Sequence, residues 1–260
     1  MGVINVTPDS LSGDGLDRSV AAAVAQGVAM VAQGADILDV GGESSRPGAV
    51  AVSVEEEMAR VVPVVRALAQ LVDRPVSVDS CKPEVMQAAL AAGGSIINDI
   101  NALRGLSGPL PSWLLAGEEP IVLMHMQGAP RTMQLDPRYQ DVVAEVYGFL
   151  AQRVHACVAQ GIARCRLVVD PGIGFGKSSA HNLALLRHLR VFRGLGLPVL
   201  LGVSRKRLVG MLVAEEEPAR RDVGSHVLAA LGVLSGARIV RVHDVAGARQ
   251  AVAVAQGWCR

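Results

Sequence analysis

Two carboxylates and one carboxamide stand at the ends of short apolar runs that are far apart in the sequence. Asp79 follows residues 76–78, Asn98 follows 96–97, and Asp170 follows 167–169. Each run has the pattern of a buried strand, and ligands of α/β folds bind at the carboxyl ends of such strands. These side chains can donate and accept along the edge of a flat heterocycle such as an aminopyrimidinone. We interpret them as a ring-binding group, although each alone could equally be a helix cap or a loop hydrogen-bonding group.

Basic side chains follow two further apolar runs near the end of the chain. Ser204, Arg205, Lys206 and Arg207 come after 199–201, and Arg241 and His243 come after 239–240. Phosphate groups often bind after the last two strands of an eight-stranded α/β barrel, and cations beside helix amino termini can hold a pyrophosphate. We predict an anion site here, with a solvated basic turn as the alternative interpretation, which suits Arg207.

The stretch after Asp170 is rich in glycine and ends in Lys177, which invites comparison with phosphate-binding loops. The P-loop pattern requires glycine five residues before Gly176, and that position is Pro171. The glycine spacing also lacks the dinucleotide-binding fingerprint. We therefore predict neither a P-loop nor a dinucleotide site.

The histidines give no metal-binding pattern. His125, His155, His181 and His188 show neither HxH nor HExxH spacing. A Mg²⁺ ion held by substrate phosphates and one amide oxygen, such as that of Asn5, would leave little trace in a sequence.

The elements that must position these groups repeat along the chain. Eight apolar runs each end in a polar group, and segments with helical spacing separate them. Eight strand–helix units in roughly 250 residues is the size of a (β/α)₈ barrel. We predict an α/β protein, a single (β/α)₈ TIM barrel with its active site at the C-terminal ends of the strands. Residues 1–260 contain no linker or low-complexity segment, so we expect one domain, with helices at about 139–160, 220–236 and 246–256 and a short one near Trp113.

Composition restricts the partners and the compartment. Half of the residues are apolar, and the net charge is +1, which gives no electrostatic case for nucleic acid or an anionic membrane. No uninterrupted run approaches the roughly 18 apolar residues of a membrane span, and we expect no signal peptide. Four scattered cysteines without a CxxC pair favour reduced thiols and a cytoplasmic location. Met1 lies almost at the first strand, which leaves room for a residue or two upstream.

Taken in order, the motifs resemble those of the bacterial dihydropteroate synthases, members of the pterin-binding enzyme superfamily. The similarity covers essentially the whole chain. The matching stretches are GVINVTPDS, DVGGESSRPGA, VSVDSCKPEV, INDI, MHMQG, DPGIGFGKS followed by HNLALLRHL, GVSRKR and RVHDV.

The resemblance implies a reaction and a set of roles. Para-aminobenzoate would displace pyrophosphate from (7,8-dihydropterin-6-yl)methyl diphosphate, by a dissociative route that needs no nucleophilic residue. The pterin would be bound by Asp79, Asn98, Asp170 and Lys206. The diphosphate would be held by Asn5, Arg241 and His243, with Asn5 on Mg²⁺ as the metal ligand. The aminobenzoate site would be formed by Ser45, Arg46, Pro47, Phe175 and Lys206. Catalytic roles fall to Lys206, Asp79, Asp170 and Arg46. The resemblance also suggests a homodimer through outer helices.

The first loop departs from the usual FSDGG of the family. Leu11 replaces the aromatic residue, and the acid is displaced by one position to Asp14. Two alternatives share the pterin contacts. A pterin-dependent methyltransferase domain gives no reason for SRK and RVH together. A non-catalytic pterin-binding paralogue should have lost diphosphate and aminobenzoate residues, whereas Arg46, Lys206, Arg241 and His243 are all present.

Overall fold

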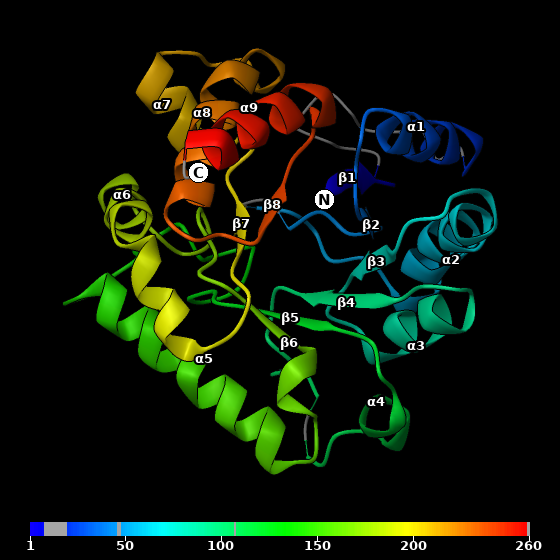
Figure 1. Cartoon of the computed structure of the whole chain (residues 1–260). Coiled ribbons are helices and arrows are strands. Elements are labelled where there is room, and N and C mark those ends of the chain that lie inside the picture. Colours follow the sequence, from blue (N-terminus) through cyan, green and yellow to red (C-terminus); the bar gives the residue numbers. More distant parts are fainter. Residues whose placement is uncertain (8–19, 46–47, 107, 259–260) are drawn as a thin grey trace.

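The computed structural model describes residues 1–7, 20–45, 48–106 and 108–258, which form a barrel of parallel strands surrounded by helices (Figure 1). All eight apolar runs form strands, as predicted. They are β1 (Gly2–Asn5), β2 (Leu38–Gly41), β3 (Val76–Asp79), β4 (Ile96–Asp99), β5 (Ile121–Met124), β6 (Leu167–Asp170), β7 (Leu200–Gly202) and β8 (Ile239–Arg241).

The strands pair in sequence order and the barrel closes on itself. β1 to β6 form one parallel sheet, and β7 pairs with β8. Bridges between Gly2 and Val242 and between Val169 and Val199 join these two sheets at both seams. The first strand therefore lies beside the last, and every strand presents its carboxyl end to the same mouth.

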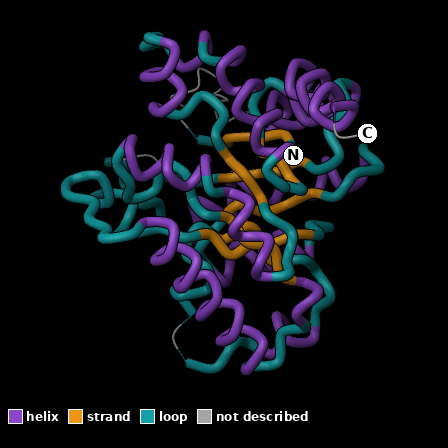
Figure 2. Tube along the Cα trace, turned by 60° about the vertical axis from the view of Figure 1, so that its left-hand side comes forward, coloured by secondary structure: helices purple, strands orange, loops and turns teal. Residues whose placement is uncertain are grey.

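Helices form the outer ring, and the strands stay central when the molecule is turned (Figure 2). The helices are α1 (Val20–Ala32), α2 (Val54–Leu71), α3 (Pro83–Ala91), α4 (Ser112–Ala116), α5 (Val142–Ala159), α6 (Ser179–Arg187), α7 (Arg207–Val213), α8 (Asp222–Leu234) and α9 (Val245–Trp258), with 3₁₀ turns at Arg164–Arg166, Leu189–Leu195 and Pro218–Arg220. The four helices predicted above are confirmed as α4, α5, α8 and α9. Among the described residues, no helix combines the length and the apolar character needed to cross a membrane.

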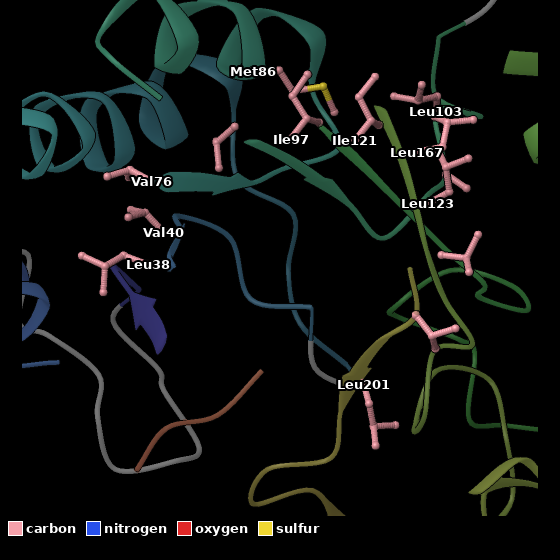
Figure 3. Packing of buried hydrophobic residues seen from close by; sticks show 14 of the residues in the cluster. Leu38, Val40, Val76, Met86, Ile97, Leu103, Ile121, Leu123, Leu167 and Leu201 are labelled. Atoms are coloured by element: carbon pink, nitrogen blue, oxygen red, sulfur yellow. The ribbon is translucent and has the colours of Figure 1, made fainter. Parts of the chain in front are cut away.

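The largest apolar cluster lies between the strands and the helices. Every second strand residue points outward into it, including Leu38 and Val40 of β2 and Ile121 and Leu123 of β5 (Figure 3). Met86 of α3 packs against the same layer. Branched aliphatic residues dominate this contact, as expected for a barrel with few aromatic residues.

The alternate strand residues fill the barrel interior. A second cluster at the amino end joins Ile96, Val122, Val168 and Leu200. Because side chains alternate along a strand, the residue two positions after Ile96 and the one two positions after Val168 also point inward. Those residues are Asn98 and Asp170. The apolar floor of the barrel is thus followed by a polar layer at its mouth.

Candidate active site

Strand register places several predicted residues in one row at the mouth. Asn5 pairs with Gly41, Gly41 with Asp79, and Asp79 with Asn98. Neighbouring strands lie about 4.8 Å apart, so the carboxylate and the carboxamide are direct neighbours. Gly41 leaves this row open between Asn5 and Asp79, because it has no side chain. The row follows from barrel closure and in-order pairing, which the eight-run pattern predicted.

Arg241 of β8 crosses the mouth and joins two carboxylates. Its Nε donates to Asp39 Oδ2 at 2.6 Å and its Nη2 donates to Asp79 Oδ2 at 2.7 Å. Asn98 Nδ2 donates to the same Asp39 oxygen at 3.1 Å. The two carboxylates raise the pKa of Arg241 despite its burial. Its guanidinium is therefore a fixed positive charge at the mouth.

Asp79 lies where its protonation state can change near neutral pH. Burial raises the pKa of this carboxyl to about 7, although Arg241 opposes the shift, and Asp39 adds to it. Desolvation disfavours the ionised form unless a donor is present. A ligand with ring N–H groups would supply such donors.

Lys206 follows β7 at the same mouth and lies over an aromatic ring. Its Nζ is 4.7 Å from the Phe175 ring centroid and donates to Ile173 O at 2.5 Å. Burial lowers the pKa of Lys206 to about 8, while Asp170 opposes the shift. Burial raises the pKa of Asp170. Lys206 and the backbone N–H of Gly172 oppose this shift, and the Gly172 N–H donates to Asp170 Oδ1 at 2.7 Å. Lys206 thus has a cation–π partner and a nearby counter-charge.

Lys177, which is 2% exposed, stabilises the glycine-rich loop after β6 through hydrogen bonds to its carbonyl groups. Its Nζ donates to Gly172 O and Phe175 O, both at 2.9 Å, and lies 2.8 Å from His125 Nδ1. Burial, with Lys177 and Arg104, lowers the pKa of His125 to about 3, so the imidazole is neutral and its Nδ1 accepts. Lys177 therefore anchors this loop, and it also belongs to the cavity lining.

A cavity of about 580 Å³ opens at this mouth. Its volume is in the usual range for small-molecule sites. The predicted residues that line it are Asn5, Ser45, Asp79, Phe175, Ser204, Arg205, Lys206, Arg207, Arg241 and His243. A second cavity of about 810 Å³ lies at the amino ends of β1, β2 and β8 and contains none of the predicted site residues.

The remaining predicted residues fall into two groups. Asn98 and Asp170 are not part of the described lining; they are buried, 5% and 6% exposed, and lie beneath it in the polar layer. Arg46 and Pro47 lie outside the described residues, as do Leu11 and Asp14 of the first loop.

Some site residues were missed by the sequence reasoning. Asp39 ends an apolar run like the others, yet it was not assigned to the site, and the Arg241 contact shows that it belongs there. Gln134, whose Nε2 donates to Gly174 O at 2.6 Å, and Arg221 both line the cavity. Gln134 lies in a long loop and Arg221 precedes a helix, so no strand-end pattern marked either one.

Two groups of side chains with different chemistry meet at this mouth. Carboxylates and a carboxamide suit a heterocycle with donors and acceptors, while Lys206, Arg241 and His243 suit an anion. His243 Nδ1 lies 2.9 Å from Ser204 Oγ, which orients the ring. Among the residues that the structure describes, no group of three or more His, Cys, Asp or Glu side chains is arranged to hold a metal ion.

Fold and site together define the class: an α/β-barrel enzyme that binds a polar heterocycle beside an anion. Residues 1–243 match the model of the family described as pterin binding enzyme. The chain is 46% identical over 259 residues to the dihydropteroate synthase of Escherichia coli K12, covering 98% of this chain and 90% of that one.

Solved structures of dihydropteroate synthases are also similar to this chain. The Xanthomonas albilineans dihydropteroate synthase with 4-aminobenzoic acid matches with a TM-score of 0.89 and 48% identity, over 100% of this chain and 92% of that one. The same enzyme in complex with 7,8-dihydropteroate matches with a TM-score of 0.87 and 46% identity, over the same shares of the two chains. The chain therefore belongs to the pterin-binding enzyme family and, within it, to the dihydropteroate synthases, which are transferases.

Proposed function

We propose that the chain condenses (7,8-dihydropterin-6-yl)methyl diphosphate with 4-aminobenzoate to give 7,8-dihydropteroate and pyrophosphate. The observation that carries the proposal is that one mouth holds both the polar group of Asp79, Asn98 and Asp170 and the basic group of Lys206, Arg241 and His243. A pterin-dependent methyltransferase domain and a non-catalytic pterin-binding paralogue both require only the polar group, so neither accounts for the basic group.

The pterin ring binds against the carboxylates. Asp79, Asn98 and Asp170 meet its N–H groups and acceptors, and Lys206 meets an acceptor of the ring. Bringing ring N–H donors to Asp79 favours its ionised form, because a hydrogen bond to a carboxylate lowers its pKa. The negative charge of Asp79 and Asp170 then lies near the cationic pterin formed during the reaction.

The reaction starts with loss of the diphosphate. The bond between the pterin methylene carbon and the bridging oxygen breaks, and its electron pair leaves with the pyrophosphate. Arg241 and His243 stabilise the charge that develops on that oxygen. The amine of 4-aminobenzoate then donates its lone pair to the methylene carbon, forms the C–N bond and releases one proton. Catalysis is positioning and charge stabilisation.

The aminobenzoate ring takes the side of the cavity lined by Ser45, Phe175 and Lys206. Phe175 offers its ring for apolar contact, and Lys206 offers positive charge to the carboxylate. Arg46 and Pro47, the next two residues in the loop after Ser45, are expected to complete this side.

We also propose Mg²⁺ as the cofactor, with Asn5 as its protein ligand. The carboxamide at the end of β1 lines the cavity, and its hard oxygen suits a metal that is otherwise held by phosphates and water. Bound there, the ion would neutralise charge on the diphosphate.

A second copy of this chain is the proposed protein partner. Val223, Val227 and Leu231 are spaced by four residues along α8 and are 77%, 53% and 52% exposed. α7 and α9 flank this helix (Figure 1), and α9 adds the exposed Trp258. An apolar stripe of this kind suits a two-fold interface between identical surfaces.

We propose in addition that residues 1–260 form one domain and that the enzyme is cytoplasmic. The free thiols of Cys81, Cys157 and Cys165 support the cytoplasmic location.

Pyrophosphate release tests the function. It should require the pterin diphosphate, Mg²⁺ and 4-aminobenzoate together in the wild type, and it should collapse in Lys206→Ala. Release that does not depend on 4-aminobenzoate, or pterin binding without release, would contradict the proposed reaction.

A further inference from the structure

Three charged side chains at the rim of the barrel link two successive strand–helix units, β2–α2 and β3–α3. Lys82, which precedes α3, lies between Glu57 of α2 and Glu43 of the loop after β2. Its Nζ is 2.5 Å from Glu57 Oε2 and also pairs with Glu43 Oε2. Glu43 lines the cavity, whereas Lys82 and Glu57 are not among the described residues that line it, so Lys82 acts on the cavity only through the loop.

The Glu57 carboxylate is buried and therefore needs the positive charge of Lys82 beside it. The Glu57 side chain is fully buried, whereas Lys82 and Glu43 retain 21% and 29% exposure. Burial raises the pKa of Glu57, and Lys82 opposes that shift. A buried carboxylate without a cation is strongly unfavourable, so Glu57 holds Lys82 in place and Lys82 in turn holds Glu43.

The residue before Glu43 is fixed to α2 independently. A Cβ atom on Gly42 would lie 2.7 Å from Val61 Cγ2 and 3.0 Å from Glu57 Cγ, so only glycine allows this close approach. Arg60 Nη1 donates to Gly42 O at 2.7 Å, and Arg60 Nη2 is 2.5 Å from Glu56 Oε1. Two consecutive loop residues are therefore attached to one rigid helix.

The next residues of the loop reach the cavity. Ser44 and Ser45 follow directly and line it together with Phe175 and Lys206. Consecutive Cα atoms are about 3.8 Å apart, so the position of residue 43 limits where Ser45 can lie. The pterin-side residues Asp79 and Asn98 belong to strands and do not depend on this loop.

We propose that the Glu57–Lys82–Glu43 bridge is a positioning device that holds residues 43–45 as the aminobenzoate wall of the cavity and so sets the affinity for 4-aminobenzoate. The proposal rests on the proposed function, because that function assigns this wall to 4-aminobenzoate. The bridge should leave binding of the pterin diphosphate unchanged.

Steady-state kinetics with both substrates varied provides the first test. Lys82→Met should raise KM for 4-aminobenzoate about tenfold, with KM for the pterin diphosphate changed less than about twofold, and Lys82→Arg should restore most of the loss. Glu43→Ala should behave like Lys82→Met. The matched control is Glu119→Ala, which removes a carboxylate of similar exposure (33%). Glu119 precedes β5, at the other end of the barrel, and lies 3.9 Å from Arg166. The control variant should match the wild type.

A second variant and a second measurement distinguish loss of the bridge from misfolding of the Lys82 variant. Glu57→Gln/Lys82→Met removes both charges of the buried pair and leaves only the partly exposed Glu43 carboxylate without its cation, and it should show the same selective rise in KM. Amide hydrogen exchange across residues 41–45 should accelerate in both Lys82 variants that lack the charge. Unchanged KM for 4-aminobenzoate, an equal rise for both substrates, or unchanged exchange would overturn the proposal. If the wild type forms no product, the proposed function fails, while the exchange experiment still decides whether the bridge holds the loop.

Discussion

Arg241 Nε lies 2.6 Å from Asp39 Oδ2, so the last strand of the barrel is bonded across its mouth to the second. The two residues are 202 positions apart in the sequence. Asp39 is completely buried and also accepts from Asn98. A single carboxylate thus orients both the cation proposed for the diphosphate and the carboxamide proposed for the pterin.

Replacing Asp39 should weaken both stability and binding. In Asp39→Asn the guanidinium keeps Asp79 but loses one of its two carboxylate partners, which should lower the free energy of unfolding by about 2 kcal/mol. kcat/KM for the pterin diphosphate should also fall, because Arg241 is then held by one carboxylate instead of two. Urea denaturation and initial rates measure the two effects. Asp36→Asn is the control: its side chain is 72% exposed and 3.7 Å from Arg249, so it should change stability by under about 0.5 kcal/mol. Equal effects of the two substitutions would contradict this role.

The pH dependence of kcat/KM should be bell-shaped, with limbs near 7 and 8. Burial raises the pKa of Asp79 to about 7, so the carboxylate that accepts from the pterin is lost as the pH falls below that value. Burial lowers the pKa of Lys206 to about 8, so its positive charge is lost as the pH rises above that value. Each limb should approach a tenfold fall per pH unit.

Single substitutions assign the two limbs. Asp79→Asn should abolish the acid limb while reducing the maximum rate. Lys206→Arg should move the alkaline limb beyond pH 10, because arginine stays protonated. A profile with the same two limbs in both variants would mean that other groups titrate.

Gly172 should not tolerate any side chain. Its φ is +67°, and a Cβ atom there would lie 1.9 Å from His125 O. Gly172→Ala should therefore cost at least about 2 kcal/mol of stability and shift Asp170, which accepts from the Gly172 N–H. Gly148→Ala, in the middle of α5 with nothing within 4 Å of the added Cβ, should instead stabilise the protein by up to about 1 kcal/mol. Thermal unfolding of the two variants tests this contrast, and a loss in both would argue against it.

The sequence alone predicts the barrel because each strand carries its own signal. An apolar run that ends in a polar residue can be recognised locally, and the alternation after Ile96 and Val168 already places Asn98 and Asp170 inside. Contacts between distant elements carry no such signal. The Asp39–Arg241 bond depends on barrel closure, and Arg221 reaches the cavity from the start of a helix. The predicted roles of Asn5, Ser45 and the other site residues stay predictions, including Arg46 and Pro47 outside the described residues.

Two lysines of the site should differ in their effect on stability when replaced by methionine. Lys177 donates to buried acceptors on both sides of the β6 loop, including Gly172 O and Phe175 O. Lys177→Met leaves these acceptors unpaired, which costs about 1–3 kcal/mol for each, and it should lower the unfolding temperature and kcat/KM together. Lys206→Met removes one backbone hydrogen bond, to Ile173 O, where Lys177 makes several, so it should cost less stability than Lys177→Met while activity is lost. Differential scanning calorimetry beside pyrophosphate release separates the two results. A stable, active Lys177→Met would show that the loop keeps Phe175 under Lys206 without its anchor.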